Sequence, residues 1–201
     1  RVARAMSQAG PPRGRGGAGR AAPRTGGQRR VIIKARIIRM SASSAGALRA
    51  HLSYIRRDAA SREEDRGRVF SAASDDENTG AFTEKAAKDR HHFRFIVSPE
   101  DGPEMADLKP FVRGLVGQME EDLGTRLDWV AAVHDDTAHP HAHIVIRGRR
   151  DDGRDLVMPR AYISHGLRGR AEDLVTLELG PETLLEAQRK LAREAGAHRL
   201  T

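Results

Sequence analysis

Two short apolar segments joined by a few polar residues constrain the fold of this chain more than any other feature. Residues 127–134 (LDWVAAVH) and 141–149 (HAHIVIRGR) are rich in the residue types that favour β-strands. The connection between them, DDTAHP, is short, which favours a direct return in the same sheet. The pair therefore predicts an antiparallel hairpin.

Further segments extend this hairpin into a domain of strands and helices. Residues 31–40 are largely β-branched, and residues 91–102 begin with alternating apolar residues, so both predict strands. N-cap residues predict a helix at about 45–58, and apolar positions at helical spacing predict one at 108–123. Two further helices are expected at about 160–179 and 181–195. The order predicts an α+β fold, with a central antiparallel sheet flanked by helices. The polar residues 59–83 predict a long loop, broken by a small strand at Val69 and Phe70.

Residues 1–30 differ in composition from the rest of the chain. They hold eight arginines, no acidic residue and many glycines and prolines, whereas the net charge of the whole chain is +7. Such a segment cannot bury enough apolar area to offset the entropy of ordering. We predict a disordered basic tail at 1–30, which either helps to hold nucleic acid through phosphate charge or is a solvated extension. A domain is expected at 31–180, followed by a helical extension at 181–201 that begins a further region of a longer protein.

Several classes of protein are excluded by what the sequence lacks. It has no cysteine, which excludes disulfides and thiolate metal sites. It has no run of 18 apolar residues, so no membrane span is expected. A reducing compartment is compatible with this composition.

The hairpin carries a cluster of histidines. Residues two apart on a strand point to the same face, so His141 and His143 project together. His134 ends the preceding strand, and closing the hairpin brings it beside them. Three imidazoles from two adjacent strands can close on one divalent cation and leave positions open for substrate. His139 could extend the row, although Pro140 makes its place in the strand doubtful.

An acidic residue follows the first histidine of the cluster. Asp136 lies two residues after His134, where a carboxylate could accept the free ring N–H of a ligand histidine and fix its tautomer. The alternative interpretation is an exposed polar strand end without a metal. The hairpin geometry and the small residue between His141 and His143 favour the metal site.

Tyr54, one of only two tyrosines, stands off the apolar face of the first predicted helix. At about 100° per residue it lies roughly 120° from the core stripe. Arg56 and Arg57 follow it after Ile55, so a phosphodiester held by these cations could be attacked by the tyrosine. The alternative is a surface tyrosine packed on a loop. The stripe itself consists of Leu48, Leu52 and Ile55.

A second group of arginines follows the histidine strand. Arg147 and Arg149, with Arg56 and Arg57 near the tyrosine, fit a path for single-stranded DNA. Solvated surface charge, balanced by the acidic residues of the long loop, is the alternative.

Together these segments resemble a known family. HLSYIRRDA (51–59) looks like the first motif of conjugative relaxases, the mobilisation nucleases of the MOB-P type within the HUH endonucleases, and HHFRFIVSPEDG (91–102) resembles their second motif. Residues 159–183 are similar to the segment after the nuclease motifs in one subgroup. The likeness extends over about residues 31–190. The third motif of the family resembles the pattern His134-x-Asp136-x-x-x-Pro140-His141-x-His143-Ile144.

The resemblance implies a specific reaction and a set of partners. Such enzymes nick one DNA strand at an origin of transfer, stay joined to its 5′ end through a tyrosine, and later rejoin it. They thereby start conjugative transfer of a plasmid or integrative element. The implied fold is a central antiparallel sheet flanked by helices. The implied partners are single-stranded DNA at that origin and accessory DNA-transfer proteins, in the bacterial cytoplasm.

The resemblance also implies roles for single residues. Tyr54 becomes the nucleophile, and His134, His141 and His143 become ligands of Mn²⁺ or Mg²⁺. Imidazoles suit Mn²⁺ better, because Mg²⁺ prefers oxygen. Two further residues are expected beside these metal ligands. Asp136 matches the family's acidic position, and His139 matches a histidine that only part of the family has.

Three alternatives remain open at this point. His139-Pro-His141-Ala-His143 also fits the loose pattern of histidine-triad nucleotide hydrolases, in which His141 would be the nucleophile, but that leaves Tyr54 unexplained. The second alternative is a DNA-binding accessory module with an inactive site. The intact Tyr54 and the complete histidine set argue against it. A rolling-circle replication initiator usually places its tyrosine after the metal motif, whereas Tyr54 comes before it.

Overall fold

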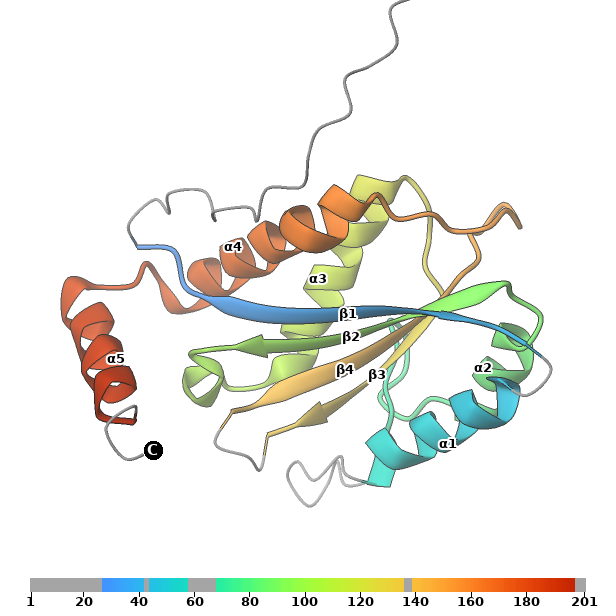
Figure 1. Cartoon of the computed structure of the whole chain (residues 1–201), viewed down its shortest axis with the longest axis horizontal. Helices are drawn as coiled ribbons and strands as arrows, with labels where there is room; N and C mark the ends of the chain where they lie inside the picture. The colour runs from blue at the N-terminus through green and yellow to red at the C-terminus, as the bar shows by residue number, and fades with distance from the viewer. Residues whose placement is uncertain (1–26, 42–43, 58–67, 136–138, 198–201) are drawn as a thin grey trace, which may run out of the picture.

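The computed structural model describes residues 27–41, 44–57, 68–135 and 139–197, and it contains one four-stranded antiparallel sheet (Figure 1). The strands lie in the order β1-β2-β4-β3. The predicted hairpin is confirmed, because β3 and β4 pair antiparallel with His134 opposite His141. The four strands are β1 (Val31–Arg39), β2 (His91–Pro99), β3 (Trp129–His134) and β4 (His141–Arg147).

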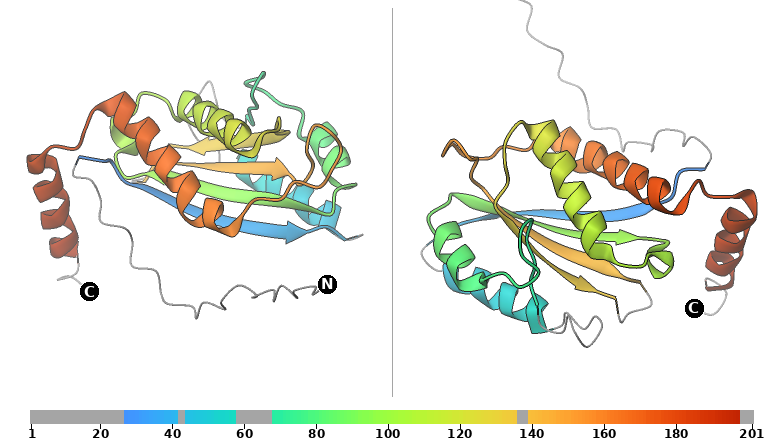
Figure 2. Two further views of the ribbon diagram at one scale, coloured as in Figure 1. Left: turned by 90° about the horizontal axis from the view of Figure 1, so that it is seen from above. Right: turned by 180° about the vertical axis from the view of Figure 1, so that it is seen from behind.

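Helices cover both faces of the sheet, which confirms the α+β fold predicted from the sequence. α1 (Ser44–Arg57) and α2 (Thr79–Ala86) pack on one face. α3 (Leu108–Leu123) and α4 (Leu167–Leu179) cross the other, as the view from above shows (Figure 2). α5 (Leu184–Ala197) lies beyond the end of the sheet where β2 finishes (Figure 1).

Alternation along the strands builds a separate apolar core on each face. Odd-numbered residues of β2, such as Phe93 and Phe95, are buried under α3 and α4. Val145 of β4 points the other way and packs under α1 and α2. One strand sequence therefore serves two layers, because successive side chains point to opposite faces.

The boundaries of α3 follow from local sequence. Asp107 caps its start, since the carboxylate accepts a hydrogen bond from the Lys109 backbone N–H at 2.8 Å. Gly124 ends it with φ of +61°, a left-handed conformation that glycine adopts without strain. The apolar stripe predicted for this helix is buried and comprises Leu108, Phe111, Val112, Leu115, Val116 and Met119.

The segment predicted as a long loop contains a helix that the sequence reasoning missed. Asn78 starts α2, because its side-chain oxygen accepts hydrogen bonds from the N–H groups of Gly80 and Ala81. Phe82 and Ala86 then bury the inner side of the helix. A polar run before these two residues hid the helix. The small strand predicted at Val69 and Phe70 is a single bridge from Phe70 to β3.

Residues 27–30, predicted as the end of the basic tail, belong to the folded part of the chain. Residues 1–26 lie outside the described part of the chain, but Arg29 is buried beside Asp101, with a nitrogen-to-oxygen distance of 3.0 Å. Lys190 of α5 contacts the same carboxylate at 2.7 Å. A buried carboxylate offsets the charge of both cations, so residues 27–30 and α5 are held at this end of the sheet.

A π-helical turn precedes α4, within the helix predicted at 160–179. It covers Tyr162–Gly166, and α4 continues from Leu167. The Tyr162 hydroxyl donates a hydrogen bond to Asp122 of α3 at 3.1 Å, which joins the two helices.

Candidate functional site

The three predicted ligand histidines lie together at one end of the sheet. Their ring centroids are 4.8 to 5.2 Å apart, and one ligand nitrogen from each lies within 4.8 Å of the others. His134 ends β3 and is buried, whereas His141 and His143 begin β4 and are half-buried. The set is sheltered but open on one side, and nitrogen donors at this spacing fit a divalent transition-metal ion.

Backbone carbonyls orient two of these rings. His134 Nε2 lies 3.0 Å from the carbonyl oxygen of Ile55, and His141 Nδ1 lies 3.0 Å from that of His139. Because a carbonyl oxygen only accepts, each of these nitrogens carries the proton. In the neutral form of each ring, the other nitrogen then has the lone pair that a metal ion needs. Asp136, predicted for this task, lies outside the described residues.

α1 presents Tyr54 at the same end of the sheet. Leu48, Leu52 and Ile55 are fully buried, while Tyr54 is 49 % exposed, so the predicted position off the core stripe is confirmed. Ile55 lies in the last turn of α1, where carbonyl groups lack partners within the helix. His134 donates to that carbonyl, so a candidate metal ligand is bonded to the residue next to the candidate nucleophile.

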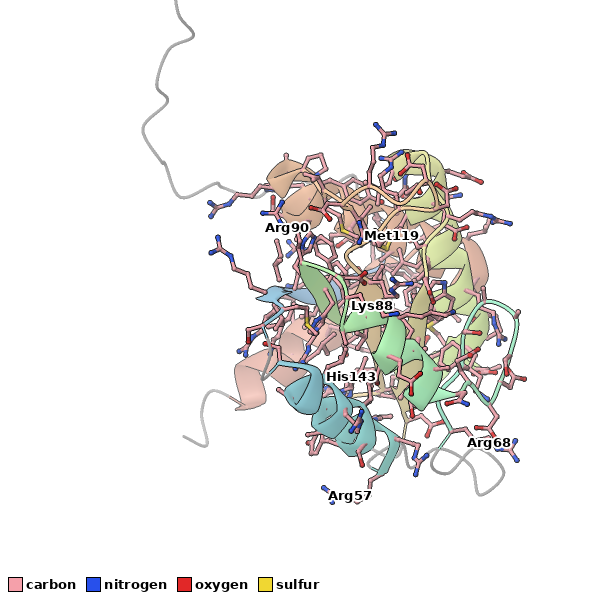
Figure 3. All side chains as sticks on the ribbon, turned by 90° about the vertical axis from the view of Figure 1, so that its right-hand side faces the viewer. Arg57, Arg68, Lys88, Arg90, Met119 and His143 are labelled. Atoms are coloured by element: carbon pink, nitrogen blue, oxygen red, sulfur yellow. The ribbon has the colours of Figure 1, made fainter. Side chains whose placement is uncertain are left out.

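The second tyrosine is in a different environment. Tyr162 lies between α3 and α4, where its hydroxyl donates to Asp122. Burial, and then the Asp122 carboxylate, raise the pKa of Tyr162 above its usual value. The histidine cluster is on the opposite face of the sheet, so Tyr54 is the tyrosine available to it. Met119 of α3 and His143, both labelled in Figure 3, mark the two faces.

A fourth histidine, missed by the sequence reasoning, stands beside the cluster. The ring of His51 lies 6.3 Å from that of His143, in an edge-on arrangement. Burial, and then the charge of Arg94, lower the pKa of His51 to about 4, so the ring is neutral at pH 7. Its position three residues before Tyr54, one helical turn away, was the available signal.

The predicted DNA-binding arginines fall into two groups. Arg56 and Arg57 are exposed at the end of α1, where Figure 3 labels Arg57. Arg147 and Arg149 lie instead at the far end of β4 from His141.

Arg147, predicted to contact DNA, forms ion pairs within the fold. Arg147 donates two hydrogen bonds of 2.8 Å to the buried carboxylate of Asp89, and a third of 3.0 Å to Asp128. Asp89 also lies 3.6 Å from Arg149. The hydrogen bonds to Asp89, and then that to Asp128, raise the pKa of Arg147. These arginines hold α2 to the sheet, and their partner Asp89, far away in sequence, could not be foreseen.

The half of the sheet beside α1 is open and cationic. Lys34 and Arg36 of β1 and Arg94 of β2 lie on the same face as the histidines, as the strand registers require. A groove of about 660 Å³ runs from His141 and His139 across β2 and β1. Lys34 lines it among apolar residues, and so does Glu100, whose carboxylate lies 3.0 Å from Arg30. The sheet residues that line this groove are Ile32, Lys34, Ile96, Ser98 and Pro99.

The strands and α1 supply no acidic side chain to this face, and Glu100, which follows β2, is the acidic residue of the groove lining. None of the four strands and no residue of α1 is Asp or Glu. The excess of cations on the strands and α1 therefore attracts anions to this face.

Comparison with known proteins gives one match. The family model described as "Relaxase: MobA/VirD2-like, nuclease domain" matches residues 59–165. That range contains all three clustered histidines and begins after Tyr54. No curated protein matches the chain. Within the described residues, every helix is too short or too polar to cross a membrane.

Proposed function

The chain belongs to the MobA/VirD2-like relaxases, a family of DNA-nicking nucleases that act in mobilisation, and we propose that it cuts and rejoins one strand at an origin of transfer through Tyr54. The match covers more than half of the chain and favours this reading over a histidine-triad hydrolase. We further assign it to the MOB-P type, which starts conjugative transfer of a plasmid or integrative element. Its expected partners are single-stranded DNA and accessory transfer proteins in the bacterial cytoplasm.

The observation that carries the proposal is the bond between the nucleophile's helix and the histidine cluster. His134 Nε2–H donates to the carbonyl of Ile55 at 3.0 Å, and Tyr54 precedes that residue. A nucleophile must be held near the group that polarises its target, because small errors in placement cost large factors in rate. This bond supplies such a restraint directly through the backbone.

The proposed reaction is a transesterification. The phenolic oxygen of Tyr54 attacks the scissile phosphorus and forms a P–O bond, while the bond from phosphorus to the 3′ oxygen breaks. The phenolic proton is lost, and the 3′ oxygen gains one to become a hydroxyl. The 5′ phosphate stays on Tyr54, and attack by a 3′ hydroxyl reverses the step. Because the ester bond is conserved, rejoining needs no external energy.

The three histidines are the proposed holders of a divalent cation. In their neutral forms, His134 and His141 each offer one ring nitrogen for coordination, because the other donates to a carbonyl oxygen. All-nitrogen ligands suit Mn²⁺ better than Mg²⁺. A bound cation would polarise the phosphate and offset negative charge in the transition state. Neutral His51 lies beside His143 and adds no competing charge.

The open cationic face is the proposed path of the DNA strand. The groove beside His141 combines apolar residues, against which bases can pack, with Lys34 for the phosphates. Arg56 and Arg57, in the last turn of α1 after Tyr54, are further candidates for phosphate contacts. His139 lines the groove, so its proposed role is contact with the strand beside the metal site.

A covalent-capture experiment tests the proposal. The protein is incubated with Mn²⁺ and a library of single-stranded oligonucleotides, and DNA attached to it is recovered under denaturing conditions and sequenced. We expect one preferred cleavage site, adducts on Tyr54, and none with Tyr54→Phe. Tyr162→Phe is the matched control and should still form adducts. Adducts that persist in Tyr54→Phe contradict the nucleophile, and wild-type protein that forms none contradicts the reaction.

A further inference from the structure

Two arginines face each other on neighbouring strands without a carboxylate between them. Arg36 of β1 lies directly opposite Arg94 of β2 in the antiparallel register. Like charges in this arrangement are destabilising. Within the ranges that the structure describes, neither guanidinium forms an ion pair with an acidic residue. A fold that keeps such a pair has left a place for an anion.

A buried histidine fixes the orientation of one of them. Arg94 Nε donates a hydrogen bond to His92 Nε2 at 2.9 Å, and the His92 side chain is fully buried. The other ring nitrogen, Nδ1, lies 3.1 Å from the sulfur of Met40. Only a neutral ring with its proton on Nδ1 satisfies both contacts, because Nε2 must accept.

The neutral state of this ring has a physical cause. Burial, and then the charge of Arg94, lower the pKa of His92 to about 4. Burial, and then Arg36, also lower the pKa of Arg94, which nevertheless stays charged at pH 7 because arginine titrates so far above it. The result is a half-buried cation that is held in one orientation and repelled by its neighbour.

The register separates this pair from the metal site by a short distance. His143 is paired with Ile96, which lies two residues along β2 from Arg94. Strand geometry therefore puts the Cα atoms of His143 and Arg94 roughly 8 Å apart. The hydrogen bond to His92 turns the guanidinium of Arg94 along β2, away from His143. An anion held by the arginines would therefore lie near the group bound at the metal site but would be a separate group.

We propose that Arg36 and Arg94 bind one non-scissile phosphate of the DNA strand, and that His92 is the positioning residue for Arg94. Two guanidinium groups can give a phosphate several charge-assisted hydrogen bonds, and the anion relieves their mutual repulsion. Arg94 keeps its two Nη groups for this task, since His92 accepts from Nε. The assignment of the anion to DNA rests on the proposed function.

A salt titration of DNA binding tests the phosphate site. Binding of a fluorescent 12-nucleotide oligo-dT is measured by anisotropy, without metal and in the Tyr54→Phe protein, so that no cleavage takes part. Arg36→Gln and Arg94→Gln should each weaken binding about tenfold. Each should also reduce the slope of log affinity against log salt by about 0.7, the value for one phosphate contact in a single strand. Arg168→Gln, an exposed arginine of α4, is the charge-matched control and should change neither.

A second pair of variants tests the positioning role. His92→Leu removes the acceptor, and His92→Gln keeps one. We expect His92→Leu to weaken oligo-dT binding as Arg94→Gln does, with no further loss in the double variant, and His92→Gln to restore most of the affinity. Additive losses, or wild-type affinity in a folded His92→Leu protein, overturn the positioning role.

One measurement keeps the positioning role testable if His92→Leu does not fold. In wild-type protein with ¹⁵Nε-labelled arginine, the Arg94 Nε–H proton should exchange slowly and its signal should shift on addition of oligo-dT. Exchange as fast as that of exposed arginines overturns the role.

The outcomes separate this inference from the proposed function. No oligo-dT binding by folded wild-type protein argues against DNA as the substrate and removes both. Binding that Arg36→Gln and Arg94→Gln leave unchanged in affinity and slope removes the phosphate site alone. The expected losses with an unchanged Arg168→Gln control support the site, whatever the cleavage assay gives.

Discussion

On the α3/α4 side an ion pair joins the two helices, with Arg170 2.7 Å from Asp122, whereas on the α1 face Lys34, Arg36 and Arg94 have no carboxylate partner among the described residues. The same four strands supply both faces. The α3/α4 face buries the larger apolar core, including Phe93 and Phe95. The α1 face is covered only over β3 and β4, and the rest of it holds the groove.

The difference between the two faces indicates how stability and activity are divided. Ion pairs and apolar packing on the α3/α4 face leave little for a ligand to gain. On the α1 face the cations repel one another beside a sheltered histidine cluster. Binding an anion there would relieve this repulsion and stabilise the folded protein. Alternation along each strand allows this division, because a change on one face need not alter the other.

Removing two ligands should give the largest effect. His141→Ala combined with His143→Ala leaves one imidazole, so we expect Mn²⁺ binding to be lost in calorimetry. Nicking should fall by more than about 100-fold, since loss of outer-shell partners alone costs up to that factor. The thermal stability of the metal-free protein should change little, because neither side chain belongs to an apolar core. His165→Ala, a histidine on the α4 side, is the control.

If the double variant nicks as wild type does, the metal site is refuted. If it loses stability as well as activity, the division between the two faces is weaker than described, and the histidines also belong to the core.

Core substitutions should act differently on the two faces. Leu115→Ala under α3 and Leu52→Ala in α1 each remove a fully buried side chain, so each should lower the free energy of unfolding by about 2–5 kcal/mol in urea titrations. At urea concentrations below the unfolding midpoint, where both variants are folded, only Leu52→Ala should also reduce nicking, because α1 carries Tyr54. Equal loss of nicking in both variants would contradict the separation of the faces.

The neutral His92 predicts a dependence of stability on pH. Its pKa is about 4 when folded, against the ordinary histidine value of 6.5, so below pH 6.5 the unfolded chain binds a proton that the folded chain does not. Stability is therefore present above pH 6.5 and is lost as the pH falls toward 4, by about 3 kcal/mol in total. His92→Gln should show a smaller loss than wild type in urea titrations at pH 7 and 4.5. Parallel losses would mean that other groups carry the effect.

Charge reversal should give the smallest effect and the sharpest comparison. Lys34→Glu on the open face should weaken oligo-dT binding roughly tenfold, by removing a phosphate contact and adding repulsion. Arg168→Glu on α4 changes the net charge equally and should have much less effect at 0.15 M salt, where screening limits long-range interactions. Equal effects would show that DNA responds to net charge instead of to one face.

The hairpin and its histidines could be predicted because their signals are local. Alternation with a period of two fixes that His141 and His143 share a face, and the short connection brings His134 beside them. α3 was equally predictable, since an apolar stripe, an N-cap and a final glycine all lie within its own residues. The position of Tyr54 off the stripe followed from helical spacing in the same way.

What the sequence could not give depends on partners far along the chain. Arg147, predicted to contact DNA, pairs with Asp89, which lies 58 residues earlier in the chain. The pairing of Arg36 with Arg94 requires the register between two strands that a long segment separates. The acceptor for His134 is a backbone carbonyl, which every residue has and no motif can mark. Proposed roles for Asp136 and for residues 1–26 lie outside the described part of the chain.

The bond from His134 to the Ile55 carbonyl has a consequence for redesign of this enzyme. Metal sites are commonly re-engineered by exchanging one ligand for another, such as histidine for aspartate. Here an aspartate or glutamate at 134 could still offer an oxygen to a cation, but an ionised carboxylate has no proton to donate to a carbonyl. The last turn of α1 would lose its tether and would face a repulsive oxygen. Metal preference at this position therefore cannot be altered independently of the placement of Tyr54.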